Sequence, residues 1–181
     1  MRHVRYNVAT TLDGFIASPD GSTDWIVHDP NIDFSALYAQ FDAFIMGRKT
    51  YETLLAFGEQ NPLRDKPREQ VIIASSEMKQ RDNEYPNITV LDEKDVLSYV
   101  VELKSKQGRD IWAYGGGQFV RTLLEGKLVD ILEVAIMPVV LGSGVKMVAD
   151  GKDGNEWKLS LDTVEKLESG ILMCKYNVLY S

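Results

Sequence analysis

The chain has 181 residues, of which 44% are hydrophobic and 26% charged, as in an ordinary globular protein. We expect one domain over residues 1–181, because this length suits a single hydrophobic core. The net charge of -7 does not favour nucleic acid or a membrane as a partner, since both attract basic surfaces. A lone cysteine, Cys174, and the lack of a signal-like or membrane-length apolar run predict a cytoplasmic protein.

Strands and helices are predicted to alternate in the first half of the chain. Apolar and polar residues alternate from Val4 to Thr10, as in a half-buried strand, and a long irregular segment extends from there to Trp25. Phe34, Leu37 and Phe41 have the spacing of one helix face. The further elements predicted here are a strand at 43–46, a helix from Arg48 with Tyr51, Leu54 and Leu55 inward, and strands at 71–74 and 88–91.

The second half begins in the same way and ends in extended structure. A helix after Asp92, a strand at 111–114 and a helix beyond Gly117 continue the alternation. Residues 129–140, 157–167 and 171–180 look extended, with Ser169 and Gly170 placed to turn the last two into a hairpin. The pattern predicts an α/β fold with a mostly parallel sheet, covered on both sides, and a C-terminal antiparallel hairpin.

One candidate anion site lies where the strand at 43–46 passes through Gly47 into a helix. Arg48 and Lys49 fall in the first turn of that helix, where the helix dipole repels cations by about 0.3 to 1 kcal/mol each. A bound phosphate would reverse that sign, and the Thr50 hydroxyl adds a donor. The alternative is a basic helix start that points into water.

A second candidate anion site is the glycine triplet Gly115, Gly116 and Gly117, followed by Gln118. It also joins a strand to a helix, and glycine lets a ligand approach the backbone closely. The alternative is a tight turn with no ligand. Two such helix starts on one parallel sheet reinforce each other, because ligands bind outside the carboxyl ends of parallel strands.

Together with the opening stretch at 9–17, Trp25 and the Pro-Val-Val-Leu-Gly-Ser-Gly run at 138–144, these segments resemble the dihydrofolate reductase superfamily. Within it, they are most similar to the branch that contains the reductase domain of riboflavin biosynthesis. The resemblance covers nearly the whole chain. It implies a dihydrofolate-reductase-like three-layer α/β/α fold with NADPH as the cofactor.

The resemblance also implies which residues bind NADPH. It places Arg48, Lys49 and Thr50 at the adenosine-side phosphates, and Gly115 to Gln118 under the pyrophosphate and nicotinamide ribose. It implies a cis peptide bond between Gly115 and Gly116, and a mobile loop from Leu12 to Trp25 over the reacting ring. The full set of expected cofactor contacts is Ala9, Ile16, Ala17, Gly47, Arg48, Lys49, Thr50, Ser75, Ser76, Gly115, Gly116, Gly117, Gln118 and Phe119.

A catalytic acid is harder to place. Relatives of the dihydrofolate reductase type carry one carboxylate in the first helix, whereas the stretch before Gly47 is shorter in this chain. Asp33 is the nearest candidate for the catalytic acid, with Asp24 and Asp29 behind it. The alternatives are that Asp33 caps a helix and that the others are loop carboxylates.

The predicted activity is hydride transfer from NADPH to a small pyrimidine or pteridine, as in 5-amino-6-(5-phosphoribosylamino)uracil reductase. Alternatives are dihydrofolate reduction itself, or a non-catalytic nucleotide-binding protein with the same fold. The two histidines, His3 and His28, are too few and too far apart for a metal site, so we expect no metal. Relatives in this branch are commonly homodimers, and we expect a homodimer here.

Overall fold

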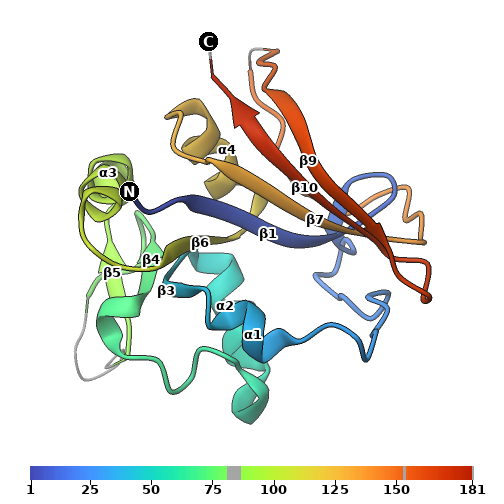
Figure 1. Cartoon of the computed structure of the whole chain (residues 1–181). Helices are drawn as coiled ribbons and strands as arrows, with labels where there is room; N and C mark the ends of the chain where they lie inside the picture. Colours follow the sequence, from blue (N-terminus) through green and yellow to red (C-terminus); the bar gives the residue numbers. More distant parts are fainter. Residues whose placement is uncertain (81–86, 153, 181) are drawn as a thin grey trace.

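The computed structural model describes residues 1–80, 87–152 and 154–180. Its main feature is a sheet in the order β5-β4-β3-β6-β1-β7-β10-β9 (Figure 1). A second, small sheet pairs β2 with β8. The strands are β1 Val4–Thr11, β2 Phe15–Ala17, β3 Phe41–Gly47, β4 Val71–Ala74, β5 Thr89–Leu91, β6 Asp110–Gly115, β7 Ile131–Met137, β8 Val145–Lys146, β9 Lys158–Lys166 and β10 Leu172–Leu179.

Most neighbouring strands of the main sheet run parallel. β1 is parallel to both β6 and β7, β3 is parallel to β6 and β4, and β4 is parallel to β5. β10 is antiparallel to both β7 and β9. The turn between β9 and β10 contains Ser169 and Gly170, and Gly170 has a φ of +88°, a conformation that favours glycine. The predicted mostly parallel sheet with a C-terminal hairpin is therefore confirmed.

Helices cover both faces of this sheet. The helices are α1 Phe34–Tyr38, α2 Arg48–Ala56, α3 Val96–Ser105 and α4 Gly117–Glu125, with single 3-10 turns at Gly58–Gln60, Arg68–Gln70 and Glu93–Asp95. In Figure 1, α3 and α4 lie on one side of the sheet and α1 and α2 on the other. The predicted three-layer α/β/α arrangement is confirmed.

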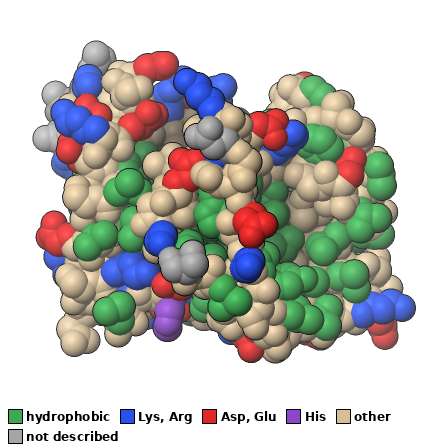
Figure 2. Space-filling model, turned by 90° about the horizontal axis from the view of Figure 1, so that it is seen from above, with side chains coloured by type: hydrophobic (Ala, Val, Ile, Leu, Met, Phe, Trp, Pro, Cys, Tyr) green, Lys and Arg blue, Asp and Glu red, His purple; other side chains and the backbone are tan. Residues whose placement is uncertain are grey.

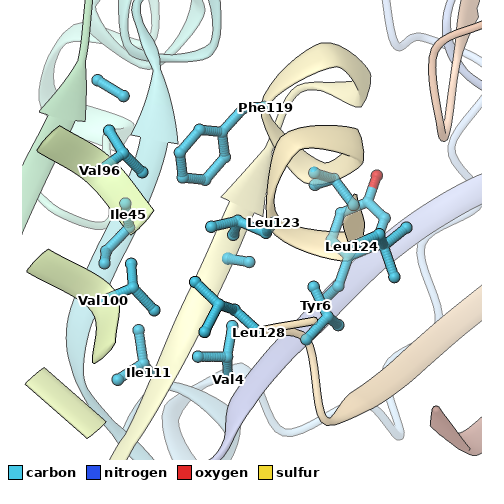
Figure 3. Close-up of a cluster of buried hydrophobic side chains, with 14 of the residues drawn as sticks. Val4, Tyr6, Ile45, Val96, Val100, Ile111, Phe119, Leu123, Leu124 and Leu128 are labelled. Carbon is cyan, nitrogen blue, oxygen red and sulfur yellow. The ribbon is translucent and has the colours of Figure 1, made fainter. Parts of the chain in front are cut away.

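Two hydrophobic clusters hold the layers together. The first lies between the sheet and α3 and α4, where Leu123 and Val100 pack against side chains of β1, β3 and β6 (Figure 3). The second lies on the other face and is rich in aromatic side chains. Its buried members are Phe41, Phe44, Met46, Tyr51, Leu54, Leu63, Val71, Ile73, Ile88 and Trp112.

Three local predictions need correction. Phe41 has the spacing of a helix residue but begins β3, where its side chain is fully buried. Leu55 was expected to face inward and is 49% exposed, because the buried stripe of α2 consists of Tyr51 and Leu54. Residues 15–17 fall in the segment expected to be irregular, yet they form β2 because β8 supplies a partner strand.

The first cluster yields a test of the core. Replacing Leu123, which is fully buried, by Ala should destabilise the fold by about 2 to 5 kcal/mol, through lost burial and a residual cavity. Urea denaturation followed by circular dichroism would measure the change. Leu179→Ala, at a position that is 52% exposed, should change the free energy of unfolding by much less. Equal losses in the two variants would contradict this assignment of the core.

Candidate functional site

The strand order reverses between β3 and β6. From β3 the chain continues through α2 to β4, on one side, whereas from β6 it continues through α4 to β7, on the other side. β3 and β6 are parallel neighbours, with Met46 opposite Gly115 at their carboxyl ends. In open α/β sheets, ligands bind in the crevice at such a reversal. The carboxyl ends of β3 and β6 are therefore the candidate site.

The two helix starts predicted from the sequence meet at this point. A Cβ atom added to Gly116 would lie 3.3 Å from Oγ1 of Thr50, and one added to Gly115 would lie 3.7 Å from the same atom. A Cβ atom added to Gly47 would lie 3.6 Å from Cβ of Phe119. The first turns of α2 and α4 are thus in contact across the ends of β3 and β6, although the helices cover opposite faces of the sheet.

The peptide bond between Gly115 and Gly116 is cis. This confirms the expectation that the family resemblance raised for this bond. Gly115 also has a φ of +131°, a backbone conformation that residues other than glycine rarely adopt. The backbone of β6 therefore passes into α4 by a path that only glycine adopts readily.

Neither helix start has a side-chain cap. The N-cap residues are Gly47 for α2 and Gly116 for α4, and neither offers an oxygen to the first backbone N–H groups. By contrast, Asp33 caps α1 through a 2.9 Å hydrogen bond from the backbone N–H of Ala36. The first N–H groups of α2 and α4 are thus available to an anion, which the helix dipoles also favour. This donor set fits the phosphates of a dinucleotide.

Arg48 is neutralised by carboxylates rather than pointing alone into water. Its guanidinium lies 2.5 Å from Glu52 Oε1, one helical turn along α2, and 3.0 Å from Glu77 Oε2, beyond the end of β4. The hydrogen bond with Glu52 is the largest cause that raises the pKa of Arg48. Lys49 is exposed and pairs with no acid among the described residues. An incoming phosphate would therefore compete with Glu77 for Arg48.

Ser75 and Ser76 follow β4, the strand beside β3. Ser75 is buried, and its hydroxyl oxygen accepts hydrogen bonds from the backbone N–H groups of Glu77 and Met78, at 3.2 and 2.8 Å. Ser76 is exposed. The structure thus gives Ser75 a role in shaping the turn that carries Glu77 toward Arg48.

The remaining expected contacts come from β1 and β2. Ala9 lies near the carboxyl end of β1, opposite Ala135 of β7, and the hydroxyl of Thr10 donates to the carbonyl of Phe15 at 3.1 Å. That bond fastens β2, which carries Ile16 and Ala17, to the end of β1. Gln118 is exposed in the first turn of α4. The residues that the sequence predicts as cofactor contacts therefore lie on the side of the sheet where the parallel strands have their carboxyl ends.

Asp13 joins two motifs that are far apart in the sequence. Its carboxylate accepts hydrogen bonds from the hydroxyl of Thr11 at 2.6 Å and from the backbone N–H groups of Leu141 and Gly142 at 3.2 and 2.7 Å. These bonds lower the pKa of Asp13, with the Thr11 hydroxyl as the largest cause. The Asp-Gly and Gly-Ser-Gly motifs thus form a single clamp at the base of the segment from Leu12 to Trp25.

Two glycines of the motifs are required by close packing. A Cβ atom on Gly117 would overlap the carbonyl oxygen of Lys146, and one on Gly144 would overlap the carbonyl oxygen of Ala17. The family resemblance implied a cofactor contact for Gly117 and used the run at 138–144 as a motif. Both glycines lie where the segment after β7 meets the candidate site or β2, a contact that the sequence alone does not indicate.

The carboxylates considered as catalytic acids are engaged in local structure. Asp33 is exposed and caps α1, so that its role as an acid stays a prediction. Asp29 is buried, and its Oδ2 accepts a 2.6 Å hydrogen bond from the Ser169 hydroxyl in the β9–β10 turn. The Nε1 atom of Trp25 is also buried, without a hydrogen-bond partner among the described residues.

Within residues 1–80, 87–152 and 154–180, no group of three or more His, Cys, Asp or Glu side chains is placed to hold a metal ion. No helix within those ranges has the length and apolar character needed to cross a membrane.

The fold and the reversal point define a protein of the dihydrofolate reductase fold class. A structure of dihydrofolate reductase from Enterococcus faecalis, in complex with NADP(H) and RAB-propyl, aligns with a TM-score of 0.63 over 97% of this chain and 96% of that chain, at 15% identity. A crystal structure of a putative riboflavin biosynthesis protein from Shewanella sp. PV-4 aligns more closely. Its TM-score is 0.81 at 25% identity, covering 99% of this chain and 100% of that one.

Sequence comparison assigns the family. The model of the RibD C-terminal domain matches residues 2–173. The uncharacterized protein YyaP of Bacillus subtilis (strain 168) is 31% identical over 180 residues, which are 97% of this chain and 95% of that protein. The chain belongs to the RibD C-terminal domain family, which is a family of reductase domains. The family resemblance stated from the motifs is confirmed.

The Asp13 clamp gives a pH-dependent prediction. Because its pKa is lowered in the folded protein, the carboxylate stabilises the fold above its ordinary pKa and loses that effect as the pH falls below about 4. Asp13→Ala should therefore lower the melting temperature at pH 7. The gap to the wild type should narrow between pH 5 and pH 3, as seen by scanning fluorimetry. A gap that does not depend on pH would rule out the ionised clamp.

Proposed function

We propose that this protein is an NADPH-dependent reductase that transfers a hydride to a small pyrimidine- or pteridine-type substrate, in the manner of 5-amino-6-(5-phosphoribosylamino)uracil reductase. One observation supports this most directly: two uncapped helix starts are in contact where the strand order reverses. A dinucleotide carries two phosphates close together, which matches two adjacent sets of free N–H donors. Membership of the RibD C-terminal domain family supports the reductase class.

In this proposal, the cofactor-contact residues divide into three groups along the sheet edge. Arg48, Lys49 and Thr50 bind the adenosine-side phosphates, with Ser75 and Ser76 beside them. Gly47 and the stretch from Gly115 to Phe119 leave room for the pyrophosphate and donate backbone N–H groups. Ala9, Ile16 and Ala17 offer backbone groups to the nicotinamide.

When bound, NADPH supplies the hydride, and the protein supplies orientation and a dry site. The segment from Leu12 to Trp25 is fixed at its base by Asp13, and in this proposal it closes over the reacting atoms and excludes water from them. Asp33 is kept as the proposed acid. Its exposed position at the start of α1 requires that it exchange its capping bond for a substrate contact.

Arg48 tests the cofactor assignment. Arg48→Ala should weaken NADPH binding by about tenfold or more, because a charge-assisted contact with the 2′-phosphate contributes about 1.5 to 3 kcal/mol. NADH lacks that phosphate, so its affinity should change little. Isothermal titration calorimetry with both cofactors would measure the two changes.

Arg109→Ala is the matched control. Arg109 is an exposed arginine immediately before β6, at the opposite end of that strand from Gly115. Its replacement should leave both affinities unchanged. Absence of any NADPH heat with the wild-type protein at millimolar concentration would refute the proposed function, and equal losses for NADPH and NADH in Arg48→Ala would refute the phosphate contact.

The homodimer expected from the family has a candidate surface on β9. All nine residues of this edge strand are exposed, and Leu159, Leu161 and Val164 continue the face of the sheet that α3 and α4 cover elsewhere. Figure 2 shows hydrophobic side chains gathered over this part of the molecule. An edge strand with an uncovered apolar face is a site for pairing with another chain. We propose that a second copy of the chain covers it.

Leu161 tests the dimer. Leu161→Lys places a charge on the proposed interface, at a side chain that is 54% exposed, and should convert the dimer to a monomer of 20.4 kDa. Size-exclusion chromatography with light scattering gives the mass directly. Val101→Lys, at a similarly exposed position on α3, should leave the mass unchanged. A monomeric wild-type protein would overturn the dimer without affecting the reductase proposal.

A further inference from the structure

Two tyrosine hydroxyls meet in a hydrogen bond, and one of the two residues directly precedes the cis peptide bond. The hydroxyl oxygens of Tyr38, in the last turn of α1, and Tyr114, near the end of β6, are 2.5 Å apart. Tyr114 directly precedes Gly115 and therefore stands at the reversal point between β3 and β6. Both side chains are only partly buried. The pair thus joins the candidate cofactor edge to α1, the helix that carries Asp33.

The aromatic surroundings hold this pair in place. The ring centroids of Tyr38 and Trp112 are 4.9 Å apart, as are those of Trp112 and Tyr114. Phe44 lies against both tyrosines, at centroid distances of 5.8 and 6.4 Å. The indole N–H of Trp112 donates to the carbonyl of Asn7 at 3.0 Å. Because these rings hold the two tyrosines in place, a tyrosine O–H loses little conformational entropy when it donates a hydrogen bond to a ligand.

Counting donors shows that one hydrogen is left over. Each tyrosine hydroxyl has one O–H donor, and the bond between the two hydroxyls uses only one of them. Neither hydroxyl has another hydrogen-bond partner among the described residues, whereas the hydroxyl of Tyr6, for example, donates to the carbonyl of Met147. The second O–H is therefore directed either at water or at a bound molecule. Its acceptor would lie at the carboxyl end of β6.

We propose that Tyr38 and Tyr114 form a substrate-binding pair, in which the uncommitted O–H donates a hydrogen bond to the carbonyl oxygen or imine nitrogen adjacent to the carbon that accepts the hydride. This inference rests on the proposed reductase function. As the hydride reaches the carbon, the π electrons of the C=O or C=N bond move onto the heteroatom, which then takes up a proton, with Asp33 as the proposed acid. A fixed donor at that heteroatom stabilises the developing negative charge.

The chemistry of the pair suits a donor rather than a base. Burial raises the pKa of both Tyr38 and Tyr114, so each hydroxyl keeps its proton at neutral pH. The pair therefore offers a neutral hydrogen-bond donor at the carboxyl end of β6, in addition to the acid proposed at Asp33.

The test is the double variant Tyr38→Phe/Tyr114→Phe, which removes both hydroxyls and keeps both rings. NADPH oxidation would be followed with 5-amino-6-(5-phosphoribosylamino)uracil and, separately, with dihydrofolate as the probe substrate. We expect kcat to fall about tenfold or more, since a lost donor of this kind costs about 10²- to 10³-fold in well-studied sites. The affinity for NADPH, by calorimetry, and the melting temperature should stay unchanged.

Tyr99→Phe is the matched control, because Tyr99 is a partly buried tyrosine on α3, on the other face of the sheet. It should keep the wild-type kcat. The two single variants show whether both hydroxyls are needed, since a pair acting as a unit predicts a loss in each.

The outcomes separate this inference from the proposed function. A double variant with the wild-type kcat overturns the tyrosine pair and leaves the reductase intact. A fall in kcat with a matching loss of NADPH affinity and melting temperature assigns the pair a structural role, which also overturns it. A wild-type protein that binds NADPH and reduces neither probe overturns the pair as stated. A wild-type protein that binds no NADPH refutes the proposed function first.

Discussion

The contact between the first turns of α2 and α4 is the constraint on which the candidate site depends. Right-handed crossovers place these helices on opposite faces, yet β3 and β6 are neighbours, so both helix starts must share one edge. Gly116 is small enough for Thr50 to approach, and Gly47 lets Phe119 pack. Larger side chains at these glycines would separate the two sets of N–H donors. The site is therefore a result of sheet topology as much as of particular side chains.

The charges around that contact are balanced within the protein. Arg48 and Lys49 lie where the helix dipole disfavours cations, and Glu52 and Glu77 offset part of that cost for Arg48. Glu77 is 74% exposed, so that its pairing is screened and readily exchanged for a phosphate. The overall charge of -7 thus coexists with a local region suited to an anion. The net charge alone therefore does not predict where an anion could bind.

Much of the fold follows from local sequence pattern, whereas the links between distant segments do not. Strand and helix order, the C-terminal hairpin and the two helix starts are visible because apolar spacing and glycine placement are local signals. The Asp13 clamp joins positions 13 and 141–142, and the pairing of Tyr38 with Tyr114 links α1 to β6. Phe41 fits a helix by spacing but belongs to β3, because packing beside Trp112 overrides periodicity.

The position of β1 has a consequence for how the chain folds. This strand lies in the middle of the sheet, and its neighbours β6 and β7 pair it with residues such as Ile111 and Ile131. Among the described residues, both of its sheet partners begin at Asp110 or later. During synthesis, β1 can therefore pair along both sides only after β6 and β7 have emerged from the ribosome. Such long sequence separation predicts slow folding, with exposed strand edges that chaperones would need to protect.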